Sequence, residues 1–400
     1  MDAEEILKAV EQGENVDSLR GNTTSASSGE TLRERYRRTM FFQHVDSIPN
    51  FEFGYWRETL PTWHEQGLPK EIDDEAKAYD YFGIENWRTA PVDVMALRPA
   101  FEEKILEETE ETVTYIDPVS GCTAQINKTG HRSIPHYLDF RLKTREDWED
   151  YKWRLEASDE RIPDNWDELV KLYRRRDYPL AVPFGSMIGR PRNWIGFENI
   201  ALMIYDDPEL LEEIVETLCN LTCGILEKVL ADVEFDFAAG WEDICFNSGP
   251  IVGVDFMQSV VTPRYKRITD LLRKHGCFIA WSDCDGNILP VTDAFLDGGI
   301  NCMFPVEVHG GSDPVLLREK HPDILLQGGV CKMKLADGKA AIREEMDRLR
   351  PLVEQGGFIP GVDHRVPADV KLDDYKFYLK LKRDMFGAGG TPRYDESKVG

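Results

Sequence analysis

From about residue 178 to the C-terminus, short apolar segments alternate with longer amphipathic ones, and this alternation constrains the fold more than any other sequence feature. The amphipathic segments 208–230 and 263–275 have the length and periodicity of helices. Repeated strand–helix units are typical of a parallel sheet covered by helices. The apolar segments that we expect to form its buried strands are 180–184, 235–241, 277–282, 301–305, 324–328 and 358–362.

Two upstream segments extend the strand count. Residues 48–55 form a short apolar run after a helix expected at about 31–41, and a further strand is expected near 92–97. The count then reaches about eight, so the simplest fold class is α/β, as a closed (β/α)8 TIM barrel. The alternative is an open doubly wound sheet. Neither of the glycine-rich nucleotide-binding motifs occurs at a strand–helix junction, which counts against that alternative.

Other segments flank or interrupt the barrel. Residues 1–30 are polar and rich in Ser and Thr near their end, so we expect a flexible N-terminal arm. Residues 31–390 are assigned to the barrel, with an insertion at about 98–178. Within that insertion, alternating polar and apolar residues around turn residues predict a β-hairpin at 103–128. Residues 391–400 are predicted to be a C-terminal tail.

Charge and composition narrow the choice of partners. Aspartate and glutamate number 73 against 48 lysines and arginines, a net charge of −25. This charge disfavours nucleic acids and anionic membranes as partners. No apolar run approaches the ~20 residues of a transmembrane helix, and the first residues do not resemble a secretory signal. We therefore expect a cytoplasmic protein that acts on a small molecule, with a homodimer as the commonest assembly.

Acidic and polar side chains follow several of the expected strands. In a barrel these C-terminal strand ends meet at one mouth, where active sites lie. Glu242 and Asp243 follow one strand and are candidate catalytic residues, although capping of a helix N-terminus is an equally ordinary role for Asp243. The next strands are followed by Asp283 and Asp285, by Glu307, and by His364.

Asp283 and Asp285 are two residues apart at a strand end, so both carboxylates point to the same side. With Glu307 and His364 they would form an oxygen-rich set with one nitrogen, which suits a hard divalent cation or a mixed-ligand zinc ion. We predict catalytic roles for Asp283, Asp285 and His364, and metal ligation for all four residues. The alternative is that the acids hydrogen-bond to loop backbone and fasten the barrel rim.

Further residues are candidates for substrate binding. Arg190 and Arg192 follow the strand at 180–184 and are expected to hold a substrate carboxylate, unless they are ordinary exposed arginines. His136, beside the expected hairpin, is a weaker candidate. Aromatic residues at strand ends are expected to enclose an apolar or cationic group, or to be ordinary core residues. These residues are Tyr55, Trp56, Trp241 and Trp281.

At these residues the sequence resembles the uroporphyrinogen decarboxylase superfamily, which includes corrinoid-linked methyltransferases. The resemblance covers about residues 31–390, and it implies a (β/α)8 barrel with its site at the strand C-termini. The segments that carry it are Trp241-Glu242-Asp243, Asp285-Gly286-Asn287, Pro305-Val306-Glu307, Gly328-Gly329-Val330, Gly356-Gly357-Phe358-Ile359-Pro360 and Asp363-His364-Arg365-Val366-Pro367.

The chain departs from the motifs of both branches. Asp283 and Asp285 stand where the methyltransferase branch has the His and the first Cys of its zinc motif, and Glu307 looks like the acidic ligand of more distant methionine synthase relatives. Asp363 and His364 lie where those enzymes have a last thiolate. True uroporphyrinogen decarboxylases have an arginine-rich segment after the first strand, whereas residues 53–59 here contain one arginine beside an acid.

The resemblance implies an enzyme that moves a methyl group from a small methylated or methoxylated substrate to a corrinoid carried by a partner protein. One divalent metal ion, zinc or a harder cation, would be its cofactor, with nothing covalently bound. The alternative enzyme is a cofactor-free decarboxylase of a small aromatic or pyrrole acid. A non-catalytic ligand-binding barrel is the alternative from another class.

Overall fold

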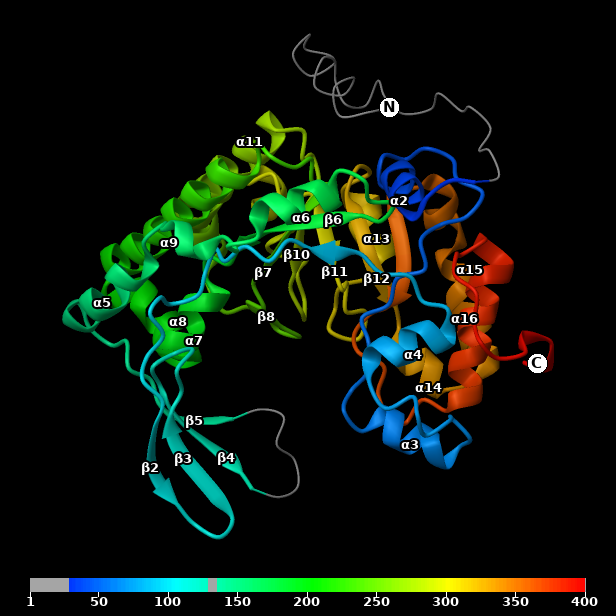
Figure 1. The fold of residues 1–400 in the computed structure, drawn as a ribbon, viewed down its shortest axis with the longest axis horizontal. Helices are drawn as coiled ribbons and strands as arrows, with labels where there is room; N and C mark the ends of the chain where they lie inside the picture. Colours follow the sequence, from blue (N-terminus) through cyan, green and yellow to red (C-terminus); the bar gives the residue numbers. More distant parts are fainter. Residues whose placement is uncertain (1–28, 129–134, 400) are drawn as a thin grey trace.

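The computed structural model describes residues 29–128 and 135–399. A curled parallel sheet of seven strands lies at its centre, with helices packed around it (Figure 1). In spatial order, the strands are β1 (Arg88–Thr89), β6 (Leu180–Gly185), β7 (Phe237–Trp241), β10 (Ala280–Asp283), β11 (Cys302–Phe304), β12 (Leu325–Val330) and β13 (Phe358–Val362). The last six strands confirm the six expected segments, with ends shifted by up to three residues.

Helices follow these strands and cover the outer face of the sheet. The longest are α9 (Pro208–Val229) and α15 (Lys339–Gln355), and α9 begins where Asp207 accepts a hydrogen bond from the Leu210 amide at 3.0 Å. The others are α2 (Leu32–Met40), α3 (Thr59–Glu65), α4 (Glu75–Phe82), α5 (Arg145–Lys152), α6 (Trp166–Tyr173), α7 (Gly189–Ile195), α8 (Phe197–Asp206), α10 (Val254–Phe256), α11 (Thr262–Lys274), α12 (Thr292–Asp297), α13 (Pro314–Lys320), α14 (Lys332–Ala336) and α16 (Leu372–Phe386). Short 3₁₀ helices span Trp153–Leu155, Asp159–Arg161 and Glu396–Lys398, and a π-helix spans Met257–Val261.

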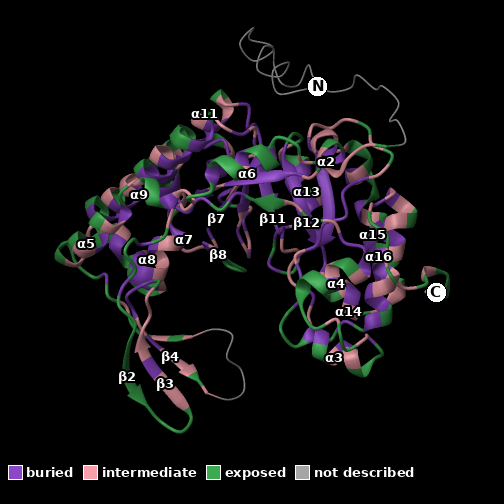
Figure 2. Ribbon diagram, viewed as in Figure 1, coloured by how far each residue is buried: buried purple, intermediate pink, exposed green. Residues whose placement is uncertain are grey.

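The concave side of the sheet is filled by side chains, so it is a packed core and not a channel. Figure 2 shows the central strands as buried, whereas the helices alternate between buried and exposed residues. Helix α2 closes one end, because the amide of Gly357, just before β13, donates to the Thr39 carbonyl at 2.7 Å. This end is opposite the strand C-termini. The buried cluster inside the curl is Tyr36, Met40, Phe51, Ala181, Phe237, Ile279, Trp281, Cys302, Phe304, Leu325 and Ile359.

The predicted closed eight-stranded barrel is corrected by the structure. Residues 48–55 are extended beside β13 but form no strand, and the bridge between Tyr55 and Val366 is isolated. The physical reason lies in Glu52, whose side chain, and not a backbone carbonyl, accepts the hydrogen bond of the Val362 amide at 2.9 Å. The curled sheet is therefore completed on this side by side-chain contacts without a ladder in the described part of the chain.

The strand expected near 92–97 is also not formed. The chain pairs with β6 only at Arg88 and Thr89. Pro91, which has no amide hydrogen, follows, and the Asp93 carboxylate then accepts hydrogen bonds from the amides of Met95 and Ala96 at 3.1 and 2.8 Å. A turn stabilised in this way replaces the expected strand.

The predicted hairpin is present within a larger antiparallel sheet. This four-stranded sheet projects from the helical body in Figure 1. The hairpin corresponds to β3 (Thr112–Ile116) and β4 (Thr123–Asn127), joined by a turn in which Asp117 accepts hydrogen bonds from Ser120. Strands β2 (Lys104–Glu108) and β5 (His136–Asp139) flank it, and a small separate hairpin pairs β8 (Cys245–Phe246) with β9 (Gly249–Pro250).

The predicted N-terminal arm falls almost entirely on residues 1–28, which lie outside the described residues. In the predicted tail, Tyr394 packs against Tyr81 and Phe82, and Glu396 forms an ion pair with Arg383. Within the described ranges, no helix is both long enough and apolar enough to span a bilayer.

Candidate active site

Three aspartates meet at the C-terminal ends of the neighbouring strands β7 and β10. Asp283 ends β10 and pairs in register with Trp241 at the end of β7. Each of Asp243, Asp283 and Asp285 has a carboxylate oxygen within 4.8 Å of one from each of the others. The Asp285 amide also donates to Asp243 Oδ1 at 3.1 Å, and Asp243 adopts a left-handed backbone conformation with φ 47°. We call Asp243, Asp283 and Asp285 the acidic triad.

His364, two residues after β13, reaches the acidic triad from the other side of the mouth. Its Nε2 atom lies 3.2 Å from Asp285 Oδ2. The ring stacks on Trp56, with centroids 5.2 Å apart, and meets the edge of Phe53. Two polar atoms, Asp285 Oδ1 and His364 Nδ1, are buried without a hydrogen-bond partner among the described residues. These atoms retain capacity for a ligand.

Proximity and burial disturb the ionisation of the triad. Burial, followed by repulsion from Asp243 and Asp285, raises the pKa of Asp283 well above the usual range of an aspartate. Burial and the charge of Asp285 also raise the pKa of Asp243. Protons or a cation would relieve this repulsion. The predicted proximity of Asp283 and Asp285 is therefore present, with Asp243 as the third member.

Glu242, a predicted catalytic residue, has a different environment from the triad. It is fully buried, and its carboxylate accepts hydrogen bonds from the amides of Met187, Ile188 and Gly189 at 2.7, 3.0 and 2.7 Å. The Ser186 hydroxyl donates a fourth at 3.2 Å. Burial raises the pKa of Glu242 to about 7 despite these donors. Its contacts fasten the turn after β6 to the end of β7.

Glu307, a predicted metal ligand, contacts a lysine and does not join the triad. Its carboxylate forms an ion pair with the Lys332 ammonium group, and Oε2 accepts from the Gly286 amide at 3.1 Å. The adjacent Asp363 is buried and accepts from the amides of Val308 and Lys332 at 3.0 and 2.8 Å. Burial raises the pKa of Asp363 to about 6. These contacts join the loops after β11, β12 and β13.

The two predicted arginines lie beside Trp241. The guanidinium groups of Arg190 and Arg192 lie 6.0 and 5.3 Å from the centre of the indole ring. Arg192 also donates to the carbonyl of Asp243 and to the side chain of Asn193. The structure thus places Trp241 and both arginines next to the acidic triad.

Three of the other predicted substrate-binding residues have different surroundings. Tyr55 is buried, and its hydroxyl lies 3.2 Å from that of Tyr375 in an aromatic core. Trp281 packs against Phe304 inside the curl of the sheet. His136 is exposed on β5, away from these strand ends in the fold (Figure 1). Trp56 differs from these three residues, because it is 39% exposed and stacks on His364 of the site.

Three charged residues near the site were not predicted. Glu52 forms a fully buried ion pair with Lys382 at 2.8 Å, beside the extended segment that completes the curl. Arg365 lies over the Phe53 ring and donates to Glu75 at 2.8 Å, and its charge partly counteracts the rise in the Asp283 pKa. The charged Glu52 within an apolar run was the one sequence signal for the buried pair.

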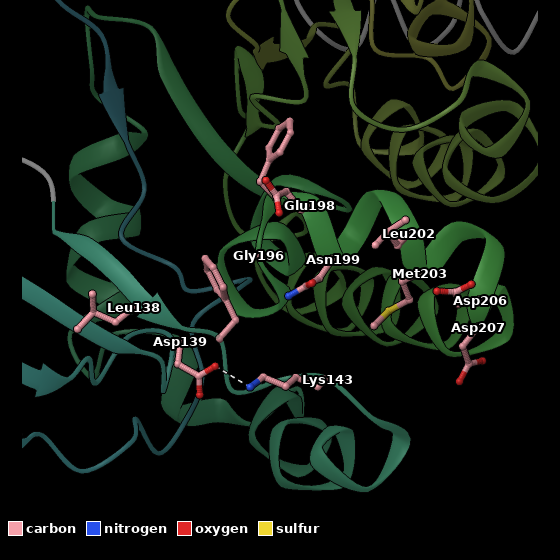
Figure 3. Close-up of a pocket in the computed structure, with 12 residues that line it drawn as sticks. Leu138, Asp139, Lys143, Gly196, Glu198, Asn199, Leu202, Met203, Asp206 and Asp207 are labelled. Carbon is pink, nitrogen blue, oxygen red and sulfur yellow. Dashed lines mark hydrogen bonds and ion pairs between the residues drawn. The ribbon is translucent and has the colours of Figure 1, made fainter.

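A separate pocket of about 780 Å³ lies between β5 and α8 and contains none of the predicted site residues. Figure 3 shows Asp139 and Lys143 paired on one side, and Asn199, Leu202 and Met203 on the other. Its walls come from the insertion and from one helix, not from strand C-termini. The strand ends, where the triad, His364 and Arg190 gather, are the better candidate for chemistry.

The fold and site together define an α/β protein with a curled parallel sheet and its polar residues at the strand C-termini. Among solved structures, this chain is similar to a methyltransferase from Methanosarcina mazei, with a TM-score of 0.55 and 14% sequence identity. The match covers 90% of this chain and all of the other. At that identity the similarity establishes the fold alone. No protein-family model matches this chain, and no curated protein matches it.

Proposed function

We propose that this protein is a methyltransferase that moves a methyl group from a small methylated or methoxylated compound to a corrinoid carried by a partner protein. The acidic triad with His364 carries the proposal. The methyltransferase with a similar fold supports it as a precedent for the fold only. The resemblance to the uroporphyrinogen decarboxylase superfamily, read from the sequence, points to the same reaction.

Methyl transfer from an ether oxygen or a neutral amine nitrogen is assisted by an acid at the leaving atom. As the methyl carbon bonds to the acceptor, its bond to the heteroatom breaks and the electron pair stays on that atom. A protonated Asp283 would donate its proton there and become a carboxylate. Its raised pKa keeps the carboxyl group protonated at a higher pH than an ordinary aspartate. Asp243 and Asp285 maintain that shift by repelling the ionised form.

A divalent cation would supply the same activation as a Lewis acid, and the residues present fit one. Asp243, Asp283, Asp285 and His364 would hold it, since they offer carboxylate oxygens and one imidazole nitrogen. The unpartnered Asp285 Oδ1 and the mutual repulsion of the acids favour binding of a positive charge. The donor set does not fit thiolate zinc, because it contains no cysteine and the nearby Cys284 is buried.

Decarboxylation is the second candidate, because Arg190 could recognise an acid substrate, although an ion pair with the carboxylate that leaves would slow its loss. The Arg190 guanidinium group has no hydrogen bond or ion pair among the described residues, so it is free to receive a carboxylate. A pyrrole or small aromatic acid would then lose carbon dioxide, with Asp283 returning a proton to the carbon. Carbon dioxide release without a methyl acceptor would favour this reaction over methyl transfer.

The deciding experiment measures methyl transfer to free cob(I)alamin, with methoxybenzoates and methylated amines as donors. We expect methylcobalamin to form with wild-type protein and not with Asp285→Ala or Asp283→Asn. Asp164→Asn, at an exposed position remote from the site, is the matched control and should be as active as wild type. Equal turnover in Asp285→Ala and wild type would rule out the proposed site.

A further inference from the structure

Arg190 and Arg192 occupy the same helix start and lie over the same indole ring, yet their bonding differs. Arg192 is engaged, because its guanidinium group donates to the Asp243 carbonyl and to Asn193 Oδ1. The Arg190 side chain makes no hydrogen bond among the described residues, and its backbone amide donates to Ser186. Its Nε atom is buried without a described partner. An arginine partly removed from water without an acceptor is poised for an anionic ligand.

The acids nearest to Arg190 are already committed elsewhere. Asp93, Asp117 and the hydroxyl group of Tyr137 interact electrostatically with Arg190, but none of them is hydrogen-bonded to it. The Asp93 carboxylate accepts from Arg161 at 3.2 Å and also pairs with Arg98. Asp117 accepts from Ser120 and Val119 in the hairpin turn. The described surroundings therefore leave the planar donor edge of Arg190 open.

The backbone that carries Arg190 is held rigidly. Its amide donates to Ser186 Oγ at 2.8 Å, and Ser186 in turn donates to the buried carboxylate of Glu242. Glu242 also receives three consecutive backbone amides of the same turn. Glu242 is therefore a positioning residue. Because Asp243 follows it directly in the chain, the contacts of Glu242 fix Arg190 relative to Asp243.

Trp241 lies between the two charged regions of the mouth. Its backbone pairs in register with Asp283 of the acidic triad, and its ring lies beside the Arg190 guanidinium. We propose that Arg190 anchors a carboxylate of the substrate, so that the methyl donors are small methylated or methoxylated carboxylic acids. This inference rests on the proposed function and names its substrate class. The planar indole would support the part of the substrate between its carboxylate and its methyl group.

The anchored carboxylate is not the group that reacts. An ion pair with Arg190 stabilises the bound carboxylate, and that interaction would be lost as carbon dioxide left, so it would raise the barrier to decarboxylation. In methyl transfer the carboxylate stays charged throughout, and the ion pair persists from bound substrate to product. Arg190 therefore serves to orient the methyl group toward the triad.

Calorimetric titration without any methyl acceptor tests the anchor. The probes are two acid–amide pairs, 3-methoxybenzoate with 3-methoxybenzamide, and glycine betaine with its amide. Wild-type protein should bind at least one acid about 10- to 100-fold more tightly than its amide, as expected for charge-assisted hydrogen bonds. Arg190→Gln should remove that preference, Arg190→Lys should retain part of it, and Arg175→Gln, at an exposed arginine, should leave it unchanged.

The outcomes separate the anchor from the proposed reaction. If wild-type protein binds each acid no more tightly than its amide, or if Arg190→Gln leaves the preference intact, the anchor is wrong whether or not methyl transfer occurs. If the preference depends on Arg190 but no donor methylates cob(I)alamin, the anchor stands and the methyltransferase assignment fails. If Arg190→Gln unfolds at the same temperature as wild type, the lost preference for the acid is not due to misfolding.

Discussion

His364 Nε2 and Asp285 Oδ2 lie 3.2 Å apart, although the two residues are separated by 79 positions in the chain. The contact joins the loop after β13 to the loop after β10 across the mouth. The other polar atoms of both side chains, Nδ1 and Oδ1, are buried without described partners. The two side chains contact each other through one polar atom each, and the second polar atom of each has no hydrogen-bond partner within the described ranges. Such unpaired buried atoms mark the place where a ligand would bind.

A divalent cation should stabilise the protein through the acidic triad. We expect millimolar Mn²⁺ or Zn²⁺ to raise the thermal unfolding temperature by a few degrees, because a ligand that binds only the folded state stabilises it by mass action. The shift should weaken as the pH falls, since protons compete for the same oxygens. Asp243→Asn and Asp285→Asn should lose the shift, and Asp164→Asn should retain it. An equal shift in all four proteins would contradict the site.

Asp283→Asn should abolish methyl transfer and yet stabilise the fold. The pKa of Asp283 is raised in the folded state, so from about pH 3.8 upward the folded state keeps a proton that the unfolded state releases, and the wild-type fold loses stability as the pH rises through that range. Substitution should therefore add about 1 kcal/mol of unfolding free energy near pH 8 and little near pH 3.5. Urea titrations at both pH values measure the difference. A destabilised variant at pH 8 would mean that ionised Asp283 contributes favourable contacts.

The strands from β6 onward were predictable because they are buried on both faces and have almost uninterrupted apolar sequences. Residues 48–55 have the same apolar character but do not form a ladder. The difference arises from Glu52. Its side chain accepts the hydrogen bond of the Val362 amide, which a backbone carbonyl would accept in a strand ladder. That competition depends on partners in β13 and α16, which local sequence patterns do not contain.

The acids of the site were predictable as a group, but not their partners. Asp283 and Asp285 follow from strand alternation. Glu242 and Asp243 are adjacent and look equivalent in sequence. In the structure, Glu242 is hydrogen-bonded to the turn after β6, whereas Asp243 lies in the mouth and contacts Asp285. Arg190 and Arg192 are similarly alike until the Asp243 carbonyl, exposed by its left-handed backbone, is seen to engage Arg192.

Stability should fall as the pH rises from about 4.5 to about 7. Burial raises the pKa of Glu242 from 4.5 to about 7 and that of Asp363 from 3.8 to about 6. In this window the folded state holds more protons than the unfolded state, so raising the pH favours unfolding. Glu242→Gln should flatten the dependence of unfolding free energy on pH by about 1–3 kcal/mol over the window. An unchanged slope would show that the amide donors keep Glu242 ionised.

The buried pair of Glu52 and Lys382 should be strongly asymmetric to substitution. Lys382→Met leaves a buried carboxylate without its cation and should cost about 3–5 kcal/mol of unfolding free energy. The double variant Glu52→Gln, Lys382→Met should lose less, because no uncompensated charge remains. Urea unfolding of both proteins measures the difference. Equal losses would mean that packing, and not charge, determines the effect.

The Glu52 side chain receives hydrogen bonds from residues 310, 326 and 330 positions later in the chain. During synthesis on a ribosome, those partners emerge more than about 300 residues after Glu52. The Glu52 carboxylate of segment 48–55 therefore stays in contact with water until the later strands have assembled. Trp56 and His364 stack beside this junction, so the mouth is completed only after the segment that follows β13 has been synthesised. A truncated nascent chain would contain the acidic triad but not a finished site.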